Sequence, residues 1–276
     1  MSAQKYLLTI ILFTIFMLTQ NIFTQESQKV IKEQLFLVQP DGKLTIKMPA
    51  GKIIVNSWDT AGAFSAFGIG NELIVKIYGN DAAEKNFNFD INKAGNDIEV
   101  KGEKNSMQKE IGDDYEIRCE VSLPKQYNFN IEADTKCGNI KISGINGSVK
   151  TNTTGGNINI EHTDGDISAN TMGGNIDIRT GTGKVDANTM GGNIKLDYSG
   201  INKGIELNTM GGNIHAVLPS DINGEADFST PSGKISCDFA QPEKSFVSSF
   251  LKAKFNNGGE KISINTSAGN INVEKK

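Results

Sequence analysis

Alternating hydrophobic and polar positions dominate the second half of the chain, where a short motif recurs four times. It reads TTGGNINI, TMGGNIDI, TMGGNIKL and TMGGNIHA, and the first glycines of the four copies are Gly155, Gly173, Gly191 and Gly211. The steps between copies are therefore 18, 18 and 20 residues. A fixed period of this length predicts a chain that coils, with each copy stacking on the previous one.

Each repeat divides into two units of about nine residues with the same pattern. Ile176 and Ile178 alternate with polar residues in one unit, and Val185 and Ala187 do so in the next. Alternation of period two predicts a strand with one buried face, so each coil has two short strands. The fold class is therefore an all-β β-solenoid with about 18 residues per coil. The predicted inward columns are Ile140/Ile142, Ile158/Ile160, Ile176/Ile178, Ile194/Leu196, Ile214/Ala216 on one side and Ile167/Ala169, Val185/Ala187, Ile205/Leu207, Ala226/Phe228 on the other.

Glycine, asparagine and threonine recur at fixed places in the predicted corners. The paired glycines are expected to adopt positive φ, as tight turns require. Stacked asparagine side chains can bond to one another along the axis of a cross-β stack. We therefore interpret three columns as structural: Asn157, Asn175, Asn193, Asn213; Asn152, Asn170, Asn188, Asn208; and Thr153, Thr171, Thr189, Thr209.

The pattern extends in both directions beyond the four best copies. Cys137–Ile140 lies 18 residues upstream of the first copy, whereas Ser232–Ile235 and Ala268–Ile271 lie downstream, 36 residues apart, which is two nominal coils. The stretch 241–259 between them is irregular, either a degenerate coil or an insertion that folds over the sheet. Lys275 and Lys276 are expected at the far edge of the stack, where lysines discourage edge pairing.

Residues 30–136 also alternate, but with less regular spacing. Leu44, Ile46 and Met48 are followed by a Pro-Ala-Gly turn and by Ile53 and Val55, and no segment shows helical periodicity. We divide the chain into a signal peptide (1–24), an irregular N-terminal β region (30–136) and regular solenoid repeats (137–276). We expect 30–276 to be one continuous domain, and a separate N-terminal β domain is the alternative.

The N-terminus resembles an export signal. Lys5 precedes an apolar run from Leu7 to Leu18, which is too short for a comfortable transmembrane helix. The predicted location is the periplasm, cell surface or extracellular space. The alternative is an uncleaved anchor, in which case the membrane contact is made through this N-terminal segment only.

Composition and cysteine usage narrow the class of protein. The chain has 30 Gly, 6 Pro, 7% aromatic residues and a formal charge of −4, so it lacks the basic footprint of a nucleic-acid binder. Three widely spaced cysteines, Cys119, Cys137 and Cys237, exclude a dense disulfide framework. Cys119 and Cys237 are predicted to point inward, and one bridge between Cys119 and Cys137 is left open.

The sequence lacks specific residues that a metal site, a phosphate loop or a hydrolase site would need. The nonapeptide spacing is similar to that of calcium-binding β-rolls, but Ile178 stands where the roll needs a ligand Asp. The stretch Gly181–Val185 lacks the full phosphate loop and its helix. His162 and His215 are nearly three coils apart. We therefore expect no catalytic residue, no cofactor and no metal.

Two outward columns carry charge, and three methionines lie beside the glycine corners. Neighbouring coils bring opposite charges together as exposed pairs worth about 0.2–1 kcal/mol each. Asp177, Lys195, Arg179 and Asp197 could imitate the site of a carbohydrate-active β-helix enzyme, but minimal turns cannot wall a groove. An apolar strip at the corners offers contact with a partner. These columns are Asn159, Asp177, Lys195, His215; Glu161, Arg179, Asp197; and Met172, Met190, Met210.

Three stretches together carry a resemblance to a known family. They are GKIIVNSWD (51–59), YEIRCEVSLPKQYNFNIEADTKCGNIKI (115–142) and the tandem Gly-x-Ile-x-apolar units that follow. Over roughly residues 35–275 they resemble the putative adhesin family of bacterial envelope proteins, domain of unknown function 4097. The resemblance implies a β-solenoid exposed at the envelope and brings no catalytic residue with it.

We therefore expect a non-enzymatic exported β-solenoid that acts as an adhesin-like interaction or scaffold module at the bacterial cell envelope. Its partner would be an unknown protein or glycan at the cell surface, and not nucleic acid. The alternative is an accessory or sensor protein in envelope stress signalling, and a carbohydrate-active β-helix enzyme is less favoured.

Overall fold

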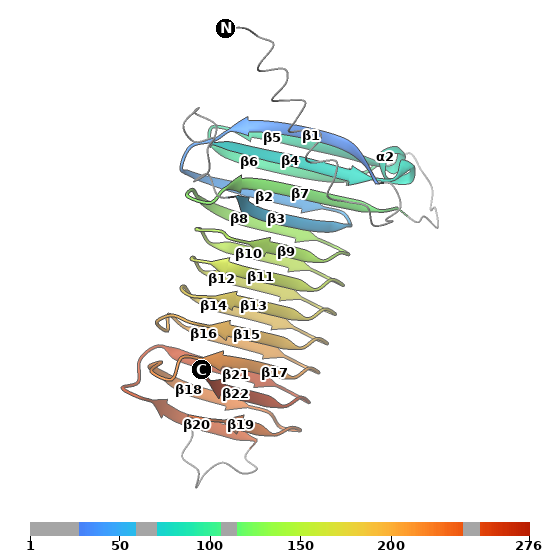
Figure 1. The fold of residues 1–276 in the computed structure, drawn as a ribbon. Coiled ribbons are helices and arrows are strands. Elements are labelled where there is room, and N and C mark those ends of the chain that lie inside the picture. Colours follow the sequence, from blue (N-terminus) through green and yellow to red (C-terminus); the bar gives the residue numbers. More distant parts are fainter. Residues whose placement is uncertain (1–27, 59–70, 106–114, 240–248) are drawn as a thin grey trace, which may run out of the picture.

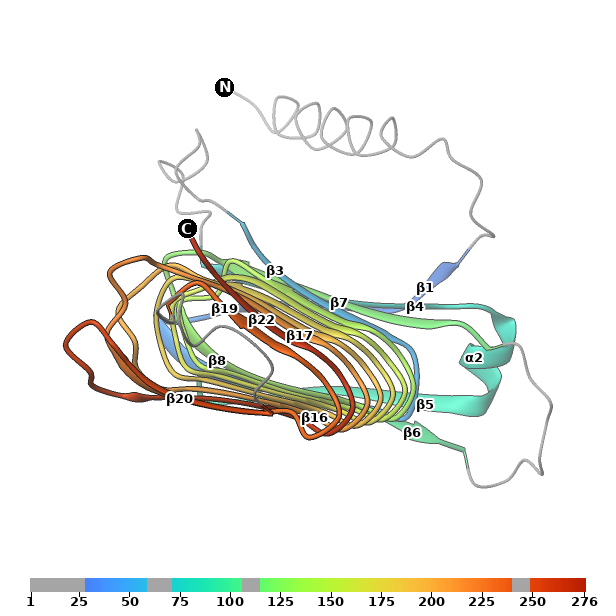
Figure 2. The ribbon, with the colours of Figure 1, turned by 90° about the horizontal axis from the view of Figure 1, so that it is seen from below.

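The chain forms a flattened stack of coils built from two long β-sheets. The structure is a computed structural model, and it describes residues 28–58, 71–105, 115–239 and 249–276. The signal peptide expected at 1–24 lies outside the described residues. Figure 1 shows the strands stacked along one axis, and Figure 2, turned by 90°, shows the successive coils superimposed. The predicted β-solenoid is therefore confirmed.

The central stack consists of five coils, each with one strand in either sheet. Neighbouring coils pair in parallel and in register, so that Ile176 lies between Ile158 and Ile194. The 20-residue step adds two residues to the corner between β15 and β16. The strands are β8 (Asn128–Thr135), β9 (Ile140–Ser143), β10 (Val149–Thr153), β11 (Ile158–Thr163), β12 (Ile167–Thr171), β13 (Ile176–Thr180), β14 (Val185–Thr189), β15 (Ile194–Tyr198), β16 (Ile205–Thr209) and β17 (Ile214–Leu218).

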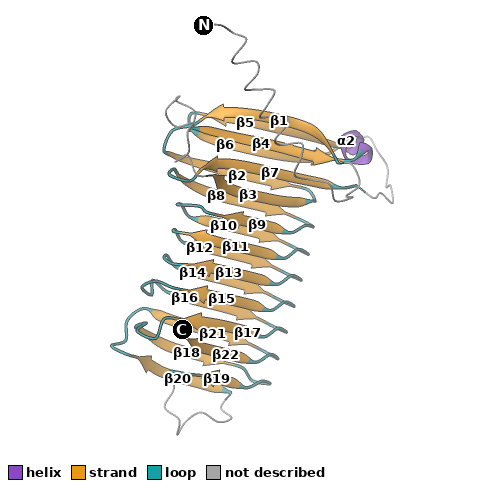
Figure 3. Cartoon of the chain, viewed as in Figure 1, coloured by secondary structure: helices purple, strands orange, loops and turns teal. Residues whose placement is uncertain are grey.

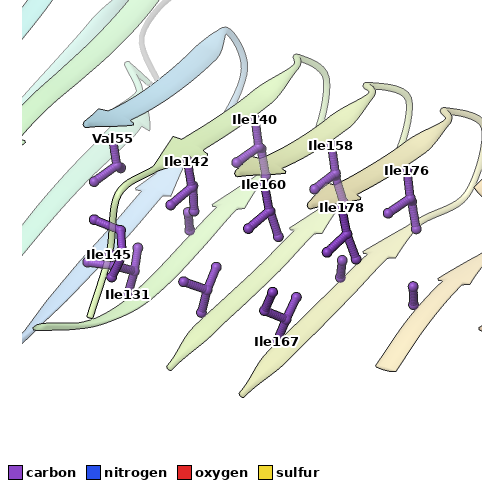
Figure 4. Packing of buried hydrophobic residues seen from close by; sticks show 14 of the residues in the cluster. Val55, Ile131, Ile140, Ile142, Ile145, Ile158, Ile160, Ile167, Ile176 and Ile178 are labelled. Carbon is purple, nitrogen blue, oxygen red and sulfur yellow. The ribbon is translucent and has the colours of Figure 1, made fainter. Parts of the chain in front are cut away.

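The interior between the two sheets is the narrow apolar core that the alternation predicts. Figure 4 shows Ile140, Ile158 and Ile176 one behind the other, with their side chains pointing inward. Every residue of the predicted inward columns is buried, and all of them belong to one hydrophobic cluster. At about 25 cal/mol per Å² of apolar area removed from water, this shared core stabilises coils that could not fold singly.

At the N-terminal end, the order of coils in space departs from their order in sequence. The coil β2–β3 lies between β6–β7 and β8–β9. Antiparallel strands then complete the end, β4 and β1 beyond β7, and β5 beyond β6. The strands are β1 (Lys29–Leu37), β2 (Asp41–Met48), β3 (Lys52–Trp58), β4 (Glu72–Gly79), β5 (Phe87–Ala94), β6 (Asp97–Lys104) and β7 (Ile117–Pro124).

One short helix, α2 (Asp81–Asn86), departs from the all-strand expectation for this region. It joins β4 to β5 and is coloured purple in Figure 3. The side chain of Asn80 accepts a hydrogen bond from the Ala83 backbone N–H at 2.9 Å, which caps the helix N-terminus. A single helical turn of this length carries no hydrophobic periodicity, so the sequence pattern could not reveal it.

The C-terminal end is also out of sequence order. The last coil, β21–β22, lies between β16–β17 and β18–β19, and the antiparallel strand β20 continues the second sheet beyond β18. The strands are β18 (Gly224–Ser229), β19 (Ile235–Cys237), β20 (Phe250–Phe255), β21 (Lys261–Thr266) and β22 (Ile271–Lys275).

Two expectations for this end are thereby wrong. Ala226 and Phe228 pair with Ile262 and Ile264, not with the coil that precedes them in sequence. The expectation for 241–259 lies partly outside the described residues, and its described part contains the edge strand β20. Lys275 ends a strand that is paired on both sides, so it guards no edge.

Candidate functional site

At the glycine corners the backbones of neighbouring coils come into close contact. The positive φ expected for the four glycine pairs is wrong. Among those eight glycines none has a positive φ. The second glycine of each pair lies directly over the corner below, so that a Cβ on Gly174 would be 1.9 Å from the carbonyl oxygen of Gly156. A Cβ on the first glycine, Gly173, would meet nothing closer than 3.8 Å. Only the second glycine of a pair is therefore required sterically.

This column of glycines runs in spatial order from the β2–β3 corner to the β18–β19 corner. A Cβ placed on any member after Gly51 would lie 1.8–1.9 Å from the carbonyl oxygen of the preceding glycine in the column. The sequence pattern already extended to Gly138, Gly233 and Gly269, but it did not place Gly51 of the Pro-Ala-Gly turn in the column. The column is Gly51, Gly138, Gly156, Gly174, Gly192, Gly212, Gly269 and Gly233.

A buried threonine column closes each corner. The hydroxyl of Thr171 donates to the carbonyl oxygen of Gly156 at 2.9 Å and accepts from the backbone N–H of Gly174 at 3.3 Å. The same two contacts recur at Thr153, Thr189, Thr209 and Thr266. Because these hydroxyls are buried and engaged on both sides, they offer no flat array to a ligand.

The predicted asparagine ladder on the second sheet is present, and its amides are engaged. The Nδ2 of Asn188 donates to the Oδ1 of Asn170 at 3.0 Å and also to Asp186 at 2.7 Å. The ladder starts at Asp134 and ends at Asn265, which bonds to Asn208 at 2.9 Å. From Asn170 to Asn265 each amide uses one N–H along the axis and one along the strand, so these amides stabilise the register of the coils.

The other asparagine column, at the corners, bonds differently. The Oδ1 of Asn157 accepts from the backbone N–H of Asn175 at 2.8 Å, and the same contact recurs along the column. These side chains are exposed, and their oxygens point along the axis. The column therefore fixes the corner backbone and leaves its amide N–H groups on the surface.

Beside this column lie the three repeat methionines, which are exposed large apolar side chains at the glycine corners. Met172, Met190 and Met210 are 52%, 48% and 56% exposed. Their backbones bond coil to coil, since Met190 N–H donates to Met172 and Met210 N–H to Met190. We name this strip of methionines, with the exposed Asn175, Asn193 and Asn213 next to it, the corner ridge.

Of the two charged columns on the first sheet, the one that contains Arg179 forms the expected ion pairs. The one that contains Asp177 and Lys195 does not. Arg179 lies 3.5 Å from Glu161 and 3.8 Å from Asp197. Asp177 and Lys195 are neighbours in register, but no ion pair joins them among the described residues. They lie on the outer sheet face and do not line a hollow. His215 lies near Glu274 at 3.8 Å, and β13 and β15 separate it from His162 on β11.

A shallow hollow of about 540 Å³ occurs elsewhere, on the outer face of β18, β20 and β21. Its lining alternates in charge, with Asp227 3.5 Å from Lys261 and 3.9 Å from Lys252. Because the Asp227 carboxylate is paired with exposed lysines, this hollow does not concentrate charge of one sign. It is far along the stack from Asp177 and Lys195.

The cysteines and the remaining titratable groups form no reactive cluster in the part of the chain that the structure describes. All three cysteines are free thiols, with Cys119 and Cys237 buried, as expected, and Cys137 exposed. Burial raises the pKa of the Cys119 thiol to about 12. No group of three His, Cys, Asp or Glu residues there could hold a metal ion, and no helix there is long and apolar enough to cross a bilayer.

Comparison with known families agrees with the resemblance drawn from the sequence. Residues 170–274 match the family described as Toastrack DUF4097. The match runs from β12 to β22, so it covers the later repeats and the C-terminal end. The resemblance to domain of unknown function 4097 is confirmed over this stretch. No curated protein matches the chain.

Two solved structures are similar over most of the chain. A "putative cell adhesion protein" from Clostridium sporogenes ATCC 15579 is 15% identical with a TM-score of 0.41, covering 89% of this chain and 99% of its own. A "putative adhesin" from Bacteroides fragilis NCTC 9343 is 13% identical with a TM-score of 0.38, covering 92% and 100%. With identities and TM-scores this low, neither likeness establishes what this chain binds.

Proposed function

We propose that this chain is a non-enzymatic, adhesin-like interaction module that is exported to the cell envelope and binds a surface protein through the corner ridge. The single observation that carries the proposal is the exposure of Met172, Met190 and Met210 in a line, one per coil. Neighbouring coils lie about 4.8 Å apart, so the three side chains form a continuous apolar strip. The threonine column and the asparagine ladder bond along the stack, whereas the methionine side chains stay exposed at every copy of the corner.

The chemistry of the ridge favours a protein partner over a glycan. Methionine side chains are flexible and polarizable, and they are enriched at protein interfaces. The exposed amides of Asn175, Asn193 and Asn213 flank the strip and can donate to backbone carbonyls at its rim. The stack holds the ridge rigid, because its backbone is bonded from coil to coil, and a rigid surface loses little conformational entropy on binding.

The test measures binding of purified envelope proteins and cell-wall glycans to the full chain and to two variants. In the ridge variant Met172, Met190 and Met210 are replaced by Ser. In the matched control, three outward residues of the second sheet, Lys150, Asp186 and Glu206, are replaced by Ser. We expect binding of a surface protein to fall by about tenfold or more in the ridge variant, equal to about 1.4 kcal/mol, and to persist in the control. Absence of binding to every class, or equal loss in both variants, would contradict the proposal.

Export is tested separately from binding. The protein is recovered from cell fractions and its N-terminus is determined by mass spectrometry. A mature chain that starts after residue 24 in the envelope or medium supports export. An intact N-terminus in the cytoplasmic fraction would count against it.

A further inference from the structure

The last coil of the chain occupies a slot between two earlier coils. We name residues 261–275, which form β21 and β22, the C-terminal rung. The rung follows β20 in sequence, but in space it separates β16–β17 from β18–β19. Figure 1 shows β21 and β22 between these pairs. The two walls of the slot are therefore built from chain that precedes the rung.

The C-terminal rung continues the glycine and threonine columns on both sides and the asparagine ladder on one side. On one side Thr266 Oγ1 donates to Gly212 at 2.8 Å, and Asn265 Nδ2 donates to Asn208 at 2.9 Å. On the other side Ile271 N–H donates to Lys234 at 2.9 Å, and Thr230 Oγ1 donates to Gly269 at 2.6 Å. The slot is thus selective for a rung with the repeat's own spacing and side chains.

The arm that delivers the rung consists of one edge strand and a loop, in which Asn256 Nδ2 donates to the Ile222 carbonyl oxygen at 2.7 Å. It begins with β20, an edge strand that pairs with β18 alone, and continues through the loop 256–260. Three residues of this loop have a positive φ: Asn256 at 48°, Gly258 at 77° and Gly259 at 134°. A loop with a non-glycine residue in this region is a place where straightening relieves strain.

A buried side chain of the central stack fixes the point where the arm meets the rung. The Nδ2 of Asn202 donates to the carbonyl oxygen of Glu260 at 2.7 Å and to that of Asn223 at 2.9 Å. Its Oδ1 accepts from the N–H of Gly204 at 2.9 Å. Asn202 therefore joins the central stack both to the start of the rung and to the start of β18.

We propose that the C-terminal rung exchanges between two copies of this chain, each rung filling the slot of the other copy. The occupant is a second copy because its rung makes the same hydrogen bonds and apolar contacts as the chain's own. Exchange then changes only the conformation of the loop 256–260 and costs the entropy that two molecules lose when they associate. This is the usual low-cost route to a domain-swapped dimer. Because rung and slot lie at the same end, the exchange closes as a reciprocal pair.

The test uses disulfide trapping between differently marked copies. Asn208 and Asn265 are paired in register on adjacent parallel strands, a separation compatible with a disulfide. Full chains carrying Asn208→Cys are mixed with full chains carrying Asn265→Cys, both with Cys137→Ser to remove the exposed thiol. The mixture is held in mild denaturant, returned to buffer, oxidised and run on a non-reducing gel. We expect a covalent dimer of one copy of each kind.

Matched controls decide the result. Asn188→Cys lies one coil further from the rung, so its mixture with Asn265→Cys should give a tenth or less of the dimer. The Asn202→Ala change should increase the dimer yield several-fold, because it removes the anchor of the arm. The double variant Asn208→Cys/Asn265→Cys should close within one chain when folded without mixing. A dimer yield equal to that of the Asn188→Cys control, or failure of the double variant to close, would overturn the proposal.

Discussion

The central stack and the two ends of this molecule obey the same corner chemistry but differ in where each coil finds its neighbour. In the centre, Gly174 lies over Gly156, its counterpart 18 residues earlier in the sequence. At the ends, Gly138 lies over Gly51, and Gly269 lies over Gly212. The ladders therefore determine which side chains a coil needs in its neighbour. They do not determine which part of the chain provides that neighbour.

The interlocked ends also change what is exposed at the limits of the stack. A last coil added in sequence order would be paired on one side only and would fray. Here the coils β2–β3 and β21–β22 are paired on both sides, and single antiparallel strands, β1, β5 and β20, take most of the edge positions. Covering the regular parallel edges in this way limits the addition of further coils from other molecules.

The largest effect is expected from removing core side chains in the two regions. Ile178→Ala in the centre and Ile264→Ala in the C-terminal rung should each lower the free energy of unfolding by about 3 kcal/mol, since both side chains are fully buried. The regions should differ in hydrogen exchange. Ile264→Ala should speed exchange in β18–β22 alone, whereas Ile178→Ala should speed it along the stack. Equal exchange patterns would show that the ends are not separate units.

The next effect separates the two glycines of a corner. Gly174→Ala should lower the free energy of unfolding by about 2–3 kcal/mol, because its Cβ would overlap the Gly156 carbonyl oxygen. Gly173→Ala should change it by no more than about 0.5 kcal/mol. Gly269→Ala, with a Cβ 1.8 Å from Gly212, tests whether the same constraint holds at the end. Chemical denaturation measures all three, and a harmless Gly174→Ala would refute the close-contact explanation.

A smaller effect is expected from breaking the asparagine ladder. Asn188→Ala removes the hydrogen bond to Asn170. It also removes the Oδ1 of Asn188, which accepts a hydrogen bond from the Nδ2 of Asn208. The expected loss is about 1 kcal/mol, the net worth of a typical hydrogen bond. Asn265→Ala in the C-terminal rung should give a similar loss if the ladder is uniform. A loss in the centre and none at the end would show that the rung is held by its apolar contacts.

The smallest effect is expected from the surface ion pairs. Arg179→Ala removes both pairs of its column, yet all three side chains are partly exposed. Denaturation at low and high salt should show a loss of about 0.5 kcal/mol or less, vanishing as salt screens the charges. A loss comparable to that of Ile178→Ala would contradict the view that these charges only assist register.

The period, the two strands per coil and the inward columns can all be read from the residue pattern alone. Ile176 and Ile178 are predictable because alternation is a local property, and a strand with one apolar face must bury that face wherever it lies. The asparagine ladder of Asn152 to Asn208 is predictable for the same reason, since equal register brings equal residues together.

The order of the coils, the reason for the glycines and the place of the last rung emerge only from the folded chain. Parallel edges of near-identical coils are nearly equivalent partners, so local patterns cannot say whether Ile262 follows Ile205 or Ala226. That choice depends on which chain segments close the stack at least cost in loops and exposed edges. Gly174 likewise satisfies a contact with Gly156 that exists only when coils are stacked. Local sequence fixes the chemistry of each rung, and the competition among equivalent edges, which only the folded chain resolves, fixes its neighbours.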